Sequence, residues 1–438
     1  MCFQPAGAGE DANGDDFLAD GKMQDNFSWR PGAPLPGIER HTLRKLDVLR
    51  DYLDVYFDTV VSDPRLDCLN ITLVDGFAGG GAYQNGDEIA DGSPLVLLHA
   101  VERARERLNR NRKKPLEINA RFFFIDDKKN HIDALYERLH HEGFSPQIGR
   151  EITVIKGKFS EELPDILTSI KAVQRAGRSI FVLDQFGYTD VPMESIRLIF
   201  SQLERPEVLL TFAIDGVLNY LQQDSSTLER YRQLGIDDHF IAEWNANKHD
   251  PALGRLISQR ALMANIQMGS GADYFTPFML WSPTDSRWMM FAHLSRHQAA
   301  RDKMLGVHWQ AQNSFRHLGR GSLFSLGFDT RLLEAKDALF NFAAHDKQKM
   351  IQELLGEVPR EISIHMKERQ LPVEHFLRMI GNRTAATNED LFSAIKELAL
   401  SREVEVISKK GTSKRIGSRI EITDRLVLPL QGTFFPLN

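Results

Sequence analysis

Apolar residues recur along this chain with two different periods. Within residues 38–60 they return every three or four positions, as at Leu46, Leu49 and Tyr52, which predicts an amphipathic helix. From residue 68 onward, short and nearly continuous apolar runs such as CLNITLVD and RFFFID alternate with amphipathic stretches of helical length. Strands of this kind, separated by helices, are typical of a parallel sheet buried on both faces. The pattern therefore predicts a doubly wound α/β domain with helices on both faces of its sheet.

The same pattern divides the chain into four parts. Residues 1–36 are rich in Gly, Ala, Asp and Pro and contain few apolar side chains, so we expect a disordered arm. The α/β domain is expected over residues 37–330, and residues 331–360 are predicted to be a helical connector, from the helical run LLEAKDALFNFAAHDKQKMIQELLG. In residues 361–438, two predicted helices are followed by the β-rich runs EVEVI and RIEIT around a basic loop. That succession is typical of a winged-helix domain.

Two apolar runs near the end of the α/β part, YFTPFMLWSP and RWMMFAHLS, are separated only by the turn-forming Pro283-Thr284-Asp285. A spacing this short suits an antiparallel hairpin. We expect this hairpin to close one edge of the sheet.

Composition and charge narrow the class of protein. The 438 residues are 42% hydrophobic and 26% charged, and no run approaches the ~18 consecutive apolar residues of a membrane helix. The first residues lack the features of a secretion signal, so we expect a cytoplasmic protein with no membrane partner. Cys2 and Cys68 are too few for a disulfide scaffold or a cysteine-built metal site, and we expect no metal. With a net charge of −6, any nucleic-acid partner would need a local basic patch.

Candidate chemistry lies where the predicted strands end, because ligands of an open parallel sheet bind outside the carboxyl ends of its strands. The first strand ends at Asp75 and is followed by a run of glycines, and the second ends at Asp126. Glycines let the backbone approach a ligand closely, and a carboxylate after the second strand can hold both ribose hydroxyls. The glycine spacing is neither G-x-G-x-x-G nor a P-loop, which favours S-adenosylmethionine (SAM) over a dinucleotide. Alternatively, Asp75 and the glycines form only a tight exit from the strand.

The fourth strand ends in Asp184-Gln185-Phe186-Gly187-Tyr188, where a methyl acceptor would lie. The Asp184 carboxylate could accept hydrogens from an exocyclic amine, and Phe186 or Tyr188 could stack on a base taken out of its duplex. Alternatively, Asp184 caps the next helix and the two rings pack in the core. No cysteine stands here, which argues against methylation of cytosine at carbon 5. A nuclease or deaminase is a weaker alternative, because the sequence has no His and Cys cluster for a metal.

These residues resemble a known family. The order HTxxKLxxLxxYL in the first helix, then VDGFAGGGAY, DGSPL, FFFIDD and VLDQFGYTDVPM, is similar to that of the three-Cys-motif partner family, TcmP, over residues 38–320. The resemblance implies a Rossmann-like class I methyltransferase fold, related to adenine-N6 rRNA methyltransferases and commonly followed by a winged helix. It also implies a partner protein with three cysteines that resembles radical-SAM proteins.

Carried onto this sequence, the resemblance implies a cofactor site at the strand ends. Its residues would be Asp75, Phe77, Ala78, Gly79 and Gly81 in the SAM loop, Asp126 at the ribose, Gly157 and Phe159 by the adenine, and Asp184 at the acceptor. We add Ser93, the expected N-cap of the next helix, to the cofactor-binding candidates. Gln185 departs from the family pattern, which has a proline that stiffens the backbone carbonyl facing an amine. This residue argues against methylation of an exocyclic amine.

The C-terminal loop between the two β-rich runs is basic, with Lys409, Lys410, Lys414, Arg415 and Arg419. In a winged helix such a loop lies on phosphates, while Ser393, Lys396 and Glu397 would face the nucleic acid from the recognition helix. Alternatively, the loop is a solvated hairpin in a domain that contacts protein.

Together these features predict a SAM-dependent methyltransferase that acts on nucleic acid, with an exocyclic amine of a base as the candidate acceptor. The alternative is a catalytically silent SAM-binding adaptor or sensor that works with the three-Cys partner. Gln185 favours the alternative.

Overall fold

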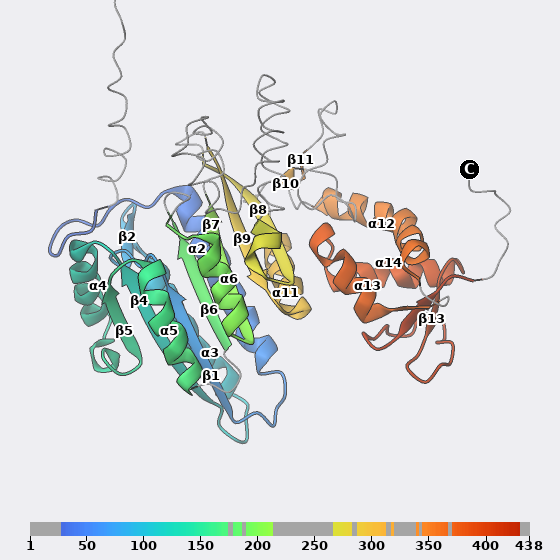
Figure 1. The fold of residues 1–438 in the computed structure, drawn as a ribbon, viewed down its shortest axis with the longest axis horizontal. Coiled ribbons are helices and arrows are strands. Elements are labelled where there is room, and N and C mark those ends of the chain that lie inside the picture. The colour runs from blue at the N-terminus through green and yellow to red at the C-terminus, as the bar shows by residue number, and fades with distance from the viewer. Residues whose placement is uncertain are drawn as a thin grey trace, which may run out of the picture.

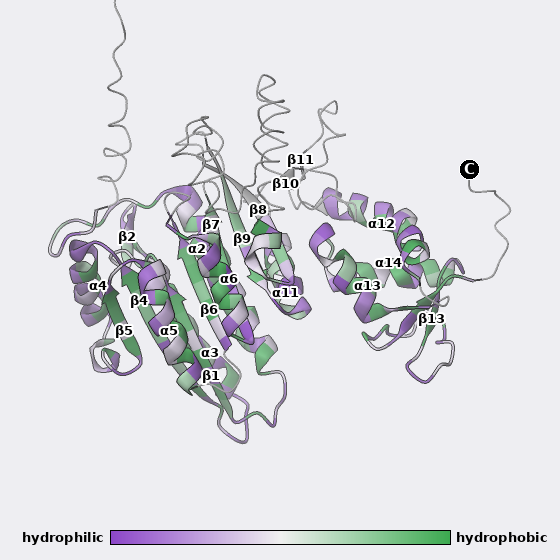
Figure 2. Ribbon diagram, viewed as in Figure 1, coloured by the Kyte–Doolittle hydropathy of each residue, from purple (hydrophilic) through white to green (hydrophobic). Residues whose placement is uncertain are grey.

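The computed structural model describes residues 28–173, 178–185, 190–212, 266–282, 287–311, 317–318, 339–340, 344–366 and 370–429. These residues form a large α/β domain and a smaller C-terminal domain (Figure 1). In the α/β domain the strands are nearly continuous in hydrophobic residues, whereas the helices turn hydrophilic residues outward (Figure 2). No helix within these ranges is long and apolar enough to cross a membrane.

Seven strands form one sheet in the order β5-β4-β1-β6-β7-β9-β8. Their bounds are β1 (Cys68–Asp75), β4 (Glu117–Asp126), β5 (Ile152–Lys156), β6 (Arg178–Asp184), β7 (Arg205–Phe212), β8 (Tyr274–Ser282) and β9 (Arg287–Ser295). The first five are parallel, and β9 runs antiparallel between β7 and β8. A mixed sheet with this strand order is typical of class I methyltransferases. The predicted α/β class and the edge hairpin are confirmed, and the turn between β8 and β9 lies outside the described residues.

Helices cover both faces of this sheet. Their bounds are α2 (Arg40–Val60), α3 (Ser93–Asn109), α4 (Lys129–His141), η3 (Ser145–Gln147), α5 (Phe159–Val173), α6 (Met193–Gln202) and α11 (Gln298–Gln310). Ile71 and Leu73 of β1 belong to one core with α2, α3 and α11, whereas Val74 belongs to a second core with α5 and α6. Successive side chains of a strand point to opposite faces, so β1 is buried on both sides. Figure 1 shows α5 and α6 in front of the sheet and α2 and α3 behind it.

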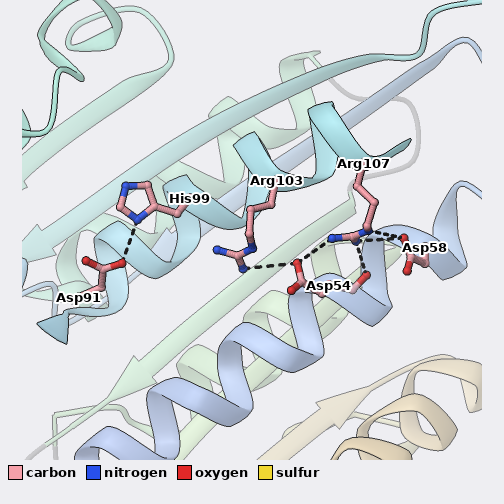
Figure 3. Close-up of polar contacts among 6 residues, drawn as sticks. All are labelled: Asp54, Asp58, Asp91, His99, Arg103 and Arg107. Atoms are coloured by element: carbon pink, nitrogen blue, oxygen red, sulfur yellow. Dashed lines mark hydrogen bonds and ion pairs between the residues drawn. The ribbon is translucent and has the colours of Figure 1, made fainter. Parts of the chain in front are cut away.

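The first helix, α2, is joined to α3 by ion pairs that Figure 3 shows. Arg107 of α3 contacts Asp58 of α2 (3.0 Å) and Asp54 of α2 (3.2 Å), and Arg103 also reaches Asp54 (3.4 Å). Below these polar contacts, apolar side chains of α2 such as Leu53 are fully buried. The two helices therefore form one layer on this face of the sheet.

A small antiparallel hairpin, β2 (Ala82–Asn85) and β3 (Glu88–Asp91), stands between β1 and α3. The Gly92 N–H closes its base by donating to the Gly81 carbonyl (2.8 Å). His99 Nδ1 on α3 lies 2.9 Å from Asp91 Oδ2 at the hairpin's end (Figure 3). This hairpin is the segment 82–92 that follows the glycine run.

Residues 28–36 were predicted to belong to a disordered arm, whereas the structure packs them on the α/β domain. Trp29 is only 4% exposed, and its indole Nε1–H donates to the Ala82 carbonyl (2.6 Å). Asn130 of α4 holds the same segment by donating to the Trp29 carbonyl (2.8 Å). Residues 28–36 have few apolar side chains, but the large Trp29 ring alone buries enough apolar surface to order the residues beside it. Residues 1–27 lie outside the described residues.

The C-terminal domain combines three helices with a small antiparallel sheet of order β12-β14-β13. Its elements are α12 (Ala344–His365), β12 (Leu371–Pro372), α13 (Val373–Ile380), η5 (Gly381–Arg383), α14 (Asn388–Leu400), β13 (Glu405–Ile407) and β14 (Arg425–Val427). Thr387 and Asp390 form a capping box at the start of α14. Helix α12 runs across residue 360, which the sequence pattern made a boundary.

Two predictions in this part of the chain are wrong in detail. The second strand of the hairpin is β14, not RIEIT, because Asp424 is buried as a turn acceptor for the Glu421 N–H (2.7 Å) and only Leu426 beyond it enters the core. Residues expected to continue a helix before α12 include β11 (Leu339–Phe340), which pairs with β10 (His317–Leu318). Pairing with a distant segment replaces the local helical preference there.

The two domains are joined through α11. Arg301 Nη2 donates to the Thr384 carbonyl (2.5 Å), and Trp309 Nε1 donates to the Ala385 carbonyl (2.9 Å). Asp302 accepts from the Asn388 N–H at the start of α14 (2.6 Å). The segment between α13 and α14 is thus bound to the α/β domain by its own backbone.

Candidate functional site

The strand ends come together as the sequence predicts. In the sheet, β1 lies between β4 and β6, and Asp75 is level with Phe124 and Val182. Asp126 and Asp184 therefore stand two residues further along on either side of Asp75, about 6–7 Å beyond its level. All three acids share the parity of Leu73, so they face the side of the sheet that α2 and α3 cover.

Asp75 is fully buried at the base of this arrangement. Its Oδ1 accepts from the Phe77 N–H (3.1 Å), while Oδ2 has no hydrogen bond of ordinary geometry within the described residues. The pKa of Asp75 is raised to about 7, chiefly by burial and also by the charges of Asp184 and Asp126, which together outweigh the lowering effect of the Ser93 hydroxyl and the Phe77 N–H. A buried carboxylate with an unsatisfied oxygen is the kind of group that a cationic ligand stabilises.

The glycine run binds directly to the second strand end. The Ala78 N–H donates to the Ile125 carbonyl (2.9 Å), and the Gly79 N–H donates to Asp126 Oδ2 (3.0 Å). Asp126 Oδ1 accepts from the Lys128 N–H (3.0 Å). Asp126 Oδ1 also lies 3.0 Å from His131 Nδ1, so Oδ2 is the oxygen that keeps capacity for a ribose hydroxyl. The carboxylate is only about 10% exposed.

Trp29 forms a wall on the glycine run that the sequence analysis did not anticipate. A Cβ atom on Gly80 would lie 2.2 Å from the indole, and one on Gly79 would lie 2.9 Å from it. Gly79 and Gly81 also have positive φ angles of 56° and 83°, which side chains rarely adopt. Glycine is required here by the neighbouring ring and by the backbone.

Tyr83, on the hairpin after the glycines, stands among the three acids. Burial, followed by the negative charges of Asp184, Asp75 and Asp126, raises the pKa of its hydroxyl. Its ring makes an edge contact with Trp29 at 5.1 Å between centroids. The hairpin therefore borders the site.

Some of the remaining cofactor candidates lie beside the strand-end acids, and others are buried in the core of the α/β domain. Ser93 is the first residue of α3 and Gly92 is its N-cap, so Ser93 does not cap the helix as predicted, and its hydroxyl lowers the pKa of Asp75. The Gly157 N–H donates to the Asp126 carbonyl (3.1 Å). Phe159 is 2% exposed, and its ring centroid lies 6.5 Å from the centroid of Phe181 and 6.5 Å from that of Phe77. Phe159 thus supports the site from the core, and the half-buried Phe77 ring lies nearer its surface.

Asp184 has a partner that the sequence analysis missed. Lys45 Nζ of α2 donates to both oxygens of Asp184, at 2.6 and 2.7 Å, although 139 residues separate them. The Lys45 side chain is 9% exposed and the Asp184 side chain 36% exposed. The carboxylate is thus bound on its buried side and open on the other. Phe186 and Tyr188 lie outside the described residues.

Gln185 points into the protein. It is 3% exposed, and its Oε1 accepts from the Val191 N–H (3.1 Å). This bond ties the end of β6 to the residue that precedes α6, across the segment in which the predicted aromatic residues stand. Gln185 therefore braces the backbone by a hydrogen bond where the family pattern has a proline ring.

Other candidates lie away from these strand ends. His293 Nε2 is 3.0 Å from Glu207 Oε2, which also accepts from the Tyr52 hydroxyl, in a buried group near the start of β7. Arg296 donates to the Phe200 carbonyl. Within the described part of the chain, no group of three or more His, Cys, Asp or Glu residues could hold a metal ion.

The basic loop after β13 offers four exposed cations. Lys409, Lys410, Arg415 and Arg419 are exposed. Lys414 differs, because its Nζ donates to Asp424 Oδ2 (2.7 Å) and to the Arg419 carbonyl (3.0 Å). Lys414 therefore holds the loop together.

Comparison with known proteins gives distant matches only. No family model and no curated protein matches the chain, so membership of the TcmP family stays a prediction. A SAM-dependent methyltransferase from Agrobacterium tumefaciens has 10% identity and a TM-score of 0.32, over 60% of this chain and 64% of that one. An rRNA methylase from Streptococcus thermophilus has 13% identity and a TM-score of 0.23, over 56% and 93%. At these scores the strand order of the sheet carries the fold assignment.

Proposed function

We propose that this protein is a SAM-dependent methyltransferase that acts on nucleic acid. The observation that carries the proposal is Asp75, a buried carboxylate with an unsatisfied oxygen between two further strand-end acids. SAM carries a sulfonium and an ammonium group, and it supplies an electrophilic methyl group when bound. An acidic, largely desolvated site binds a positively charged ligand such as SAM more strongly than an uncharged ligand of similar shape.

The residues of this chain fit the parts of SAM. Asp126 Oδ2 can accept from a ribose hydroxyl, and the glycine run brings backbone close to it. Asp184, held by Lys45, stands on the opposite side of Asp75 and is open to an acceptor. Gln185 joins the end of β6 to Val191 by a hydrogen bond.

The C-terminal domain supports the choice of nucleic acid. Its element order is helix, strand, helix, helix, and two strands around a basic loop, which is the order of a winged helix. Four of the five predicted contact residues, Lys409, Lys410, Arg415 and Arg419, are exposed and available to phosphates.

Transfer of a tritiated methyl group from SAM to total RNA and to DNA tests this proposal. We expect label in nucleic acid with the wild-type protein and none with Asp184→Ala, which removes the acceptor-side carboxylate. Asp127→Ala is the matched control, because Asp127 is an exposed neighbour of the site. A fully active Asp184→Ala variant would contradict the assigned acceptor.

A second candidate, a catalytically silent adaptor for a three-Cys partner, is favoured by one observation. Lys45 already binds both oxygens of Asp184, and these are the atoms that would receive the hydrogens of an amine. SAM binding without methyl transfer to either nucleic acid would support the adaptor.

A further inference from the structure

A cavity of about 270 Å³ lies in the C-terminal domain, between the end of α14 and the loop that follows β13. Its lining includes Lys396 of α14, Arg402 just after that helix, and Arg415 of the loop. Val404, Val406 and Ile420 are buried and support its floor. The cavity belongs neither to the strand-end site nor to the contact between the two domains.

The charged residues that line the cavity are mostly cations, beside apolar side chains such as Val404 and Ile420. Glu405 is the one acid among its lining residues, against Lys396, Arg402, Lys414 and Arg415. Lys414 is neutralised by Asp424, which accepts from it at 2.7 Å. Within the described residues, the side chains of the other three cations have no hydrogen bond or ion pair. The remaining charge is therefore positive and available to a ligand.

Arg402 has an unusual backbone. Its φ angle is 64°, and it is the one residue other than glycine with a positive φ in the described part of the chain. Helices commonly end in this conformation, but with glycine, because a side chain there is strained by roughly 1 kcal/mol. Arg402 keeps a side chain and a positive charge at a position where glycine is the usual residue. A strained residue that lines a cavity indicates a function for its side chain.

We propose that Lys396, Arg402 and Arg415 form a pocket for a phosphate group of the nucleic-acid backbone. This inference rests on the proposed function and moves the centre of the contact. The sequence predicted contacts along the whole loop, at Lys409, Lys410, Lys414, Arg415 and Arg419, with Lys396 on the recognition helix. Arg402 was not predicted, and Lys409 and Lys410 do not line the cavity. The structure instead points to the groove between the loop and the end of α14.

The test uses the full chain with fluorescein-labelled 20-mers of RNA and DNA, single-stranded and duplex, in anisotropy titrations between 50 and 300 mM salt. Arg402→Gly removes the charge and also relieves the backbone strain. We expect it to bind roughly five- to tenfold more weakly near 100 mM salt, with a salt slope smaller by about 1. Its melting temperature should be equal to or above that of the wild type. Arg402→Asn, which also tolerates this backbone, should behave in the same way.

Lys410→Ala is the matched control, an exposed cation of the same loop outside the cavity. We expect it to weaken binding less than Arg402→Gly does. Unchanged binding by Arg402→Gly, or an equal loss in Lys410→Ala, would overturn the pocket while the proposed function stands. If the wild-type protein binds SAM but none of the four oligonucleotides, the nucleic-acid part of the proposed function fails together with the pocket.

Discussion

The Asp75 carboxyl group couples ligand binding to pH. Its folded pKa is about 7, above the ordinary value of 3.8, because of burial and the neighbouring acids. A raised carboxyl pKa stabilises the ligand-free fold at low pH, and this contribution is lost as the pH rises from 3.8 through 7. A cationic ligand favours the ionised form of Asp75, whereas the ligand-free fold favours the protonated form.

We therefore expect SAM to bind more tightly as the pH rises through 7. With one linked proton, the dissociation constant should fall about tenfold between pH 6 and pH 8. Asp75→Asn cannot titrate and should bind weakly at both values. Calorimetry at the two pH values, in buffers of different ionisation enthalpy, measures the affinity and the proton released. An affinity that does not change with pH in the wild type would remove Asp75 from the site.

Lys45 positions Asp184, and its removal should separate catalysis from cofactor binding. Lys45→Met leaves the Asp184 carboxylate without its buried donor, so methyl transfer should fall by at least about tenfold, or about 1.4 kcal/mol in activation free energy. SAM affinity should change by less than about threefold, and Lys45→Arg should recover part of the rate. Radiolabel transfer rates and calorimetry with the two variants check this. Equal losses of binding and transfer would indicate that Lys45 only supports the fold.

The acids of the site could be predicted from the sequence, because each directly follows an apolar run. Lys45 could not be assigned to Asp184, since only the packing of α2 on the sheet brings together residues that are 139 positions apart. Trp29 was missed because its segment is polar in composition. The strain at Arg402 depends on a backbone angle for which the sequence offers no signal, since glycine is the usual residue there.

The hairpin of β2 and β3 depends on a titratable contact with α3. The hydrogen bond that protonated His99 donates to Asp91, together with the charge of Asp91, raises the pKa of His99 above 6.5 against the effect of burial. For Asp91, burial raises the pKa, but the hydrogen bond and charge of His99 outweigh it and lower the pKa below 3.8. The stabilisation is complete below pH 6.5, down to the Asp91 range, and is lost as the pH rises through the folded pKa of His99.

His99→Gln should therefore lower the melting temperature at pH 5.5, by about 1–3 °C, and have no effect at pH 9. Differential scanning calorimetry of the variant and the wild type at both values checks this. His141→Gln is a control, since His141 is mostly exposed on α4. The same difference in melting temperature between variant and wild type at both pH values would show that the ion pair does not stabilise the hairpin.

The helices and strands of the α/β domain follow from the sequence because burial on both faces leaves long apolar runs. The short strands do not. β14 is three residues long and is selected by the turn at Asp424, and β11 pairs with a segment some twenty residues away. Such strands depend on tertiary pairing, which a local pattern does not contain.

The two domains should unfold together because their contact is buried. Burial lowers the pKa of Arg301 to about 10, so it remains charged at neutral pH while its guanidinium donates to the Thr384 carbonyl. Arg301→Ala leaves a cavity and an unpaired carbonyl and should cost about 2–4 kcal/mol. We expect calorimetry to show a second, separate transition for the C-terminal domain. Arg378→Ala, at an exposed 3.5 Å contact with Asp273, should have little effect. One unshifted transition in Arg301→Ala would contradict a buried, coupled contact.

At the scale of the whole molecule, the succession of an α/β domain and a helical domain with a small hairpin could be predicted from the periodicity. The contact between them could not, because it is made by backbone carbonyls at Thr384 and Ala385. Every residue has a backbone carbonyl, so the residue types at these positions do not indicate that the carbonyls face the other domain.

The account depends on the strand-end acids forming a site for SAM, and a calorimetric titration of SAM into the full chain tests this most directly. We predict one-to-one binding by the wild type and by the exposed-neighbour variant Asp127→Ala, and at least tenfold weaker binding by Asp126→Ala with an unchanged circular dichroism spectrum. No binding by the folded wild-type protein, or equal affinity in Asp126→Ala, would contradict the account.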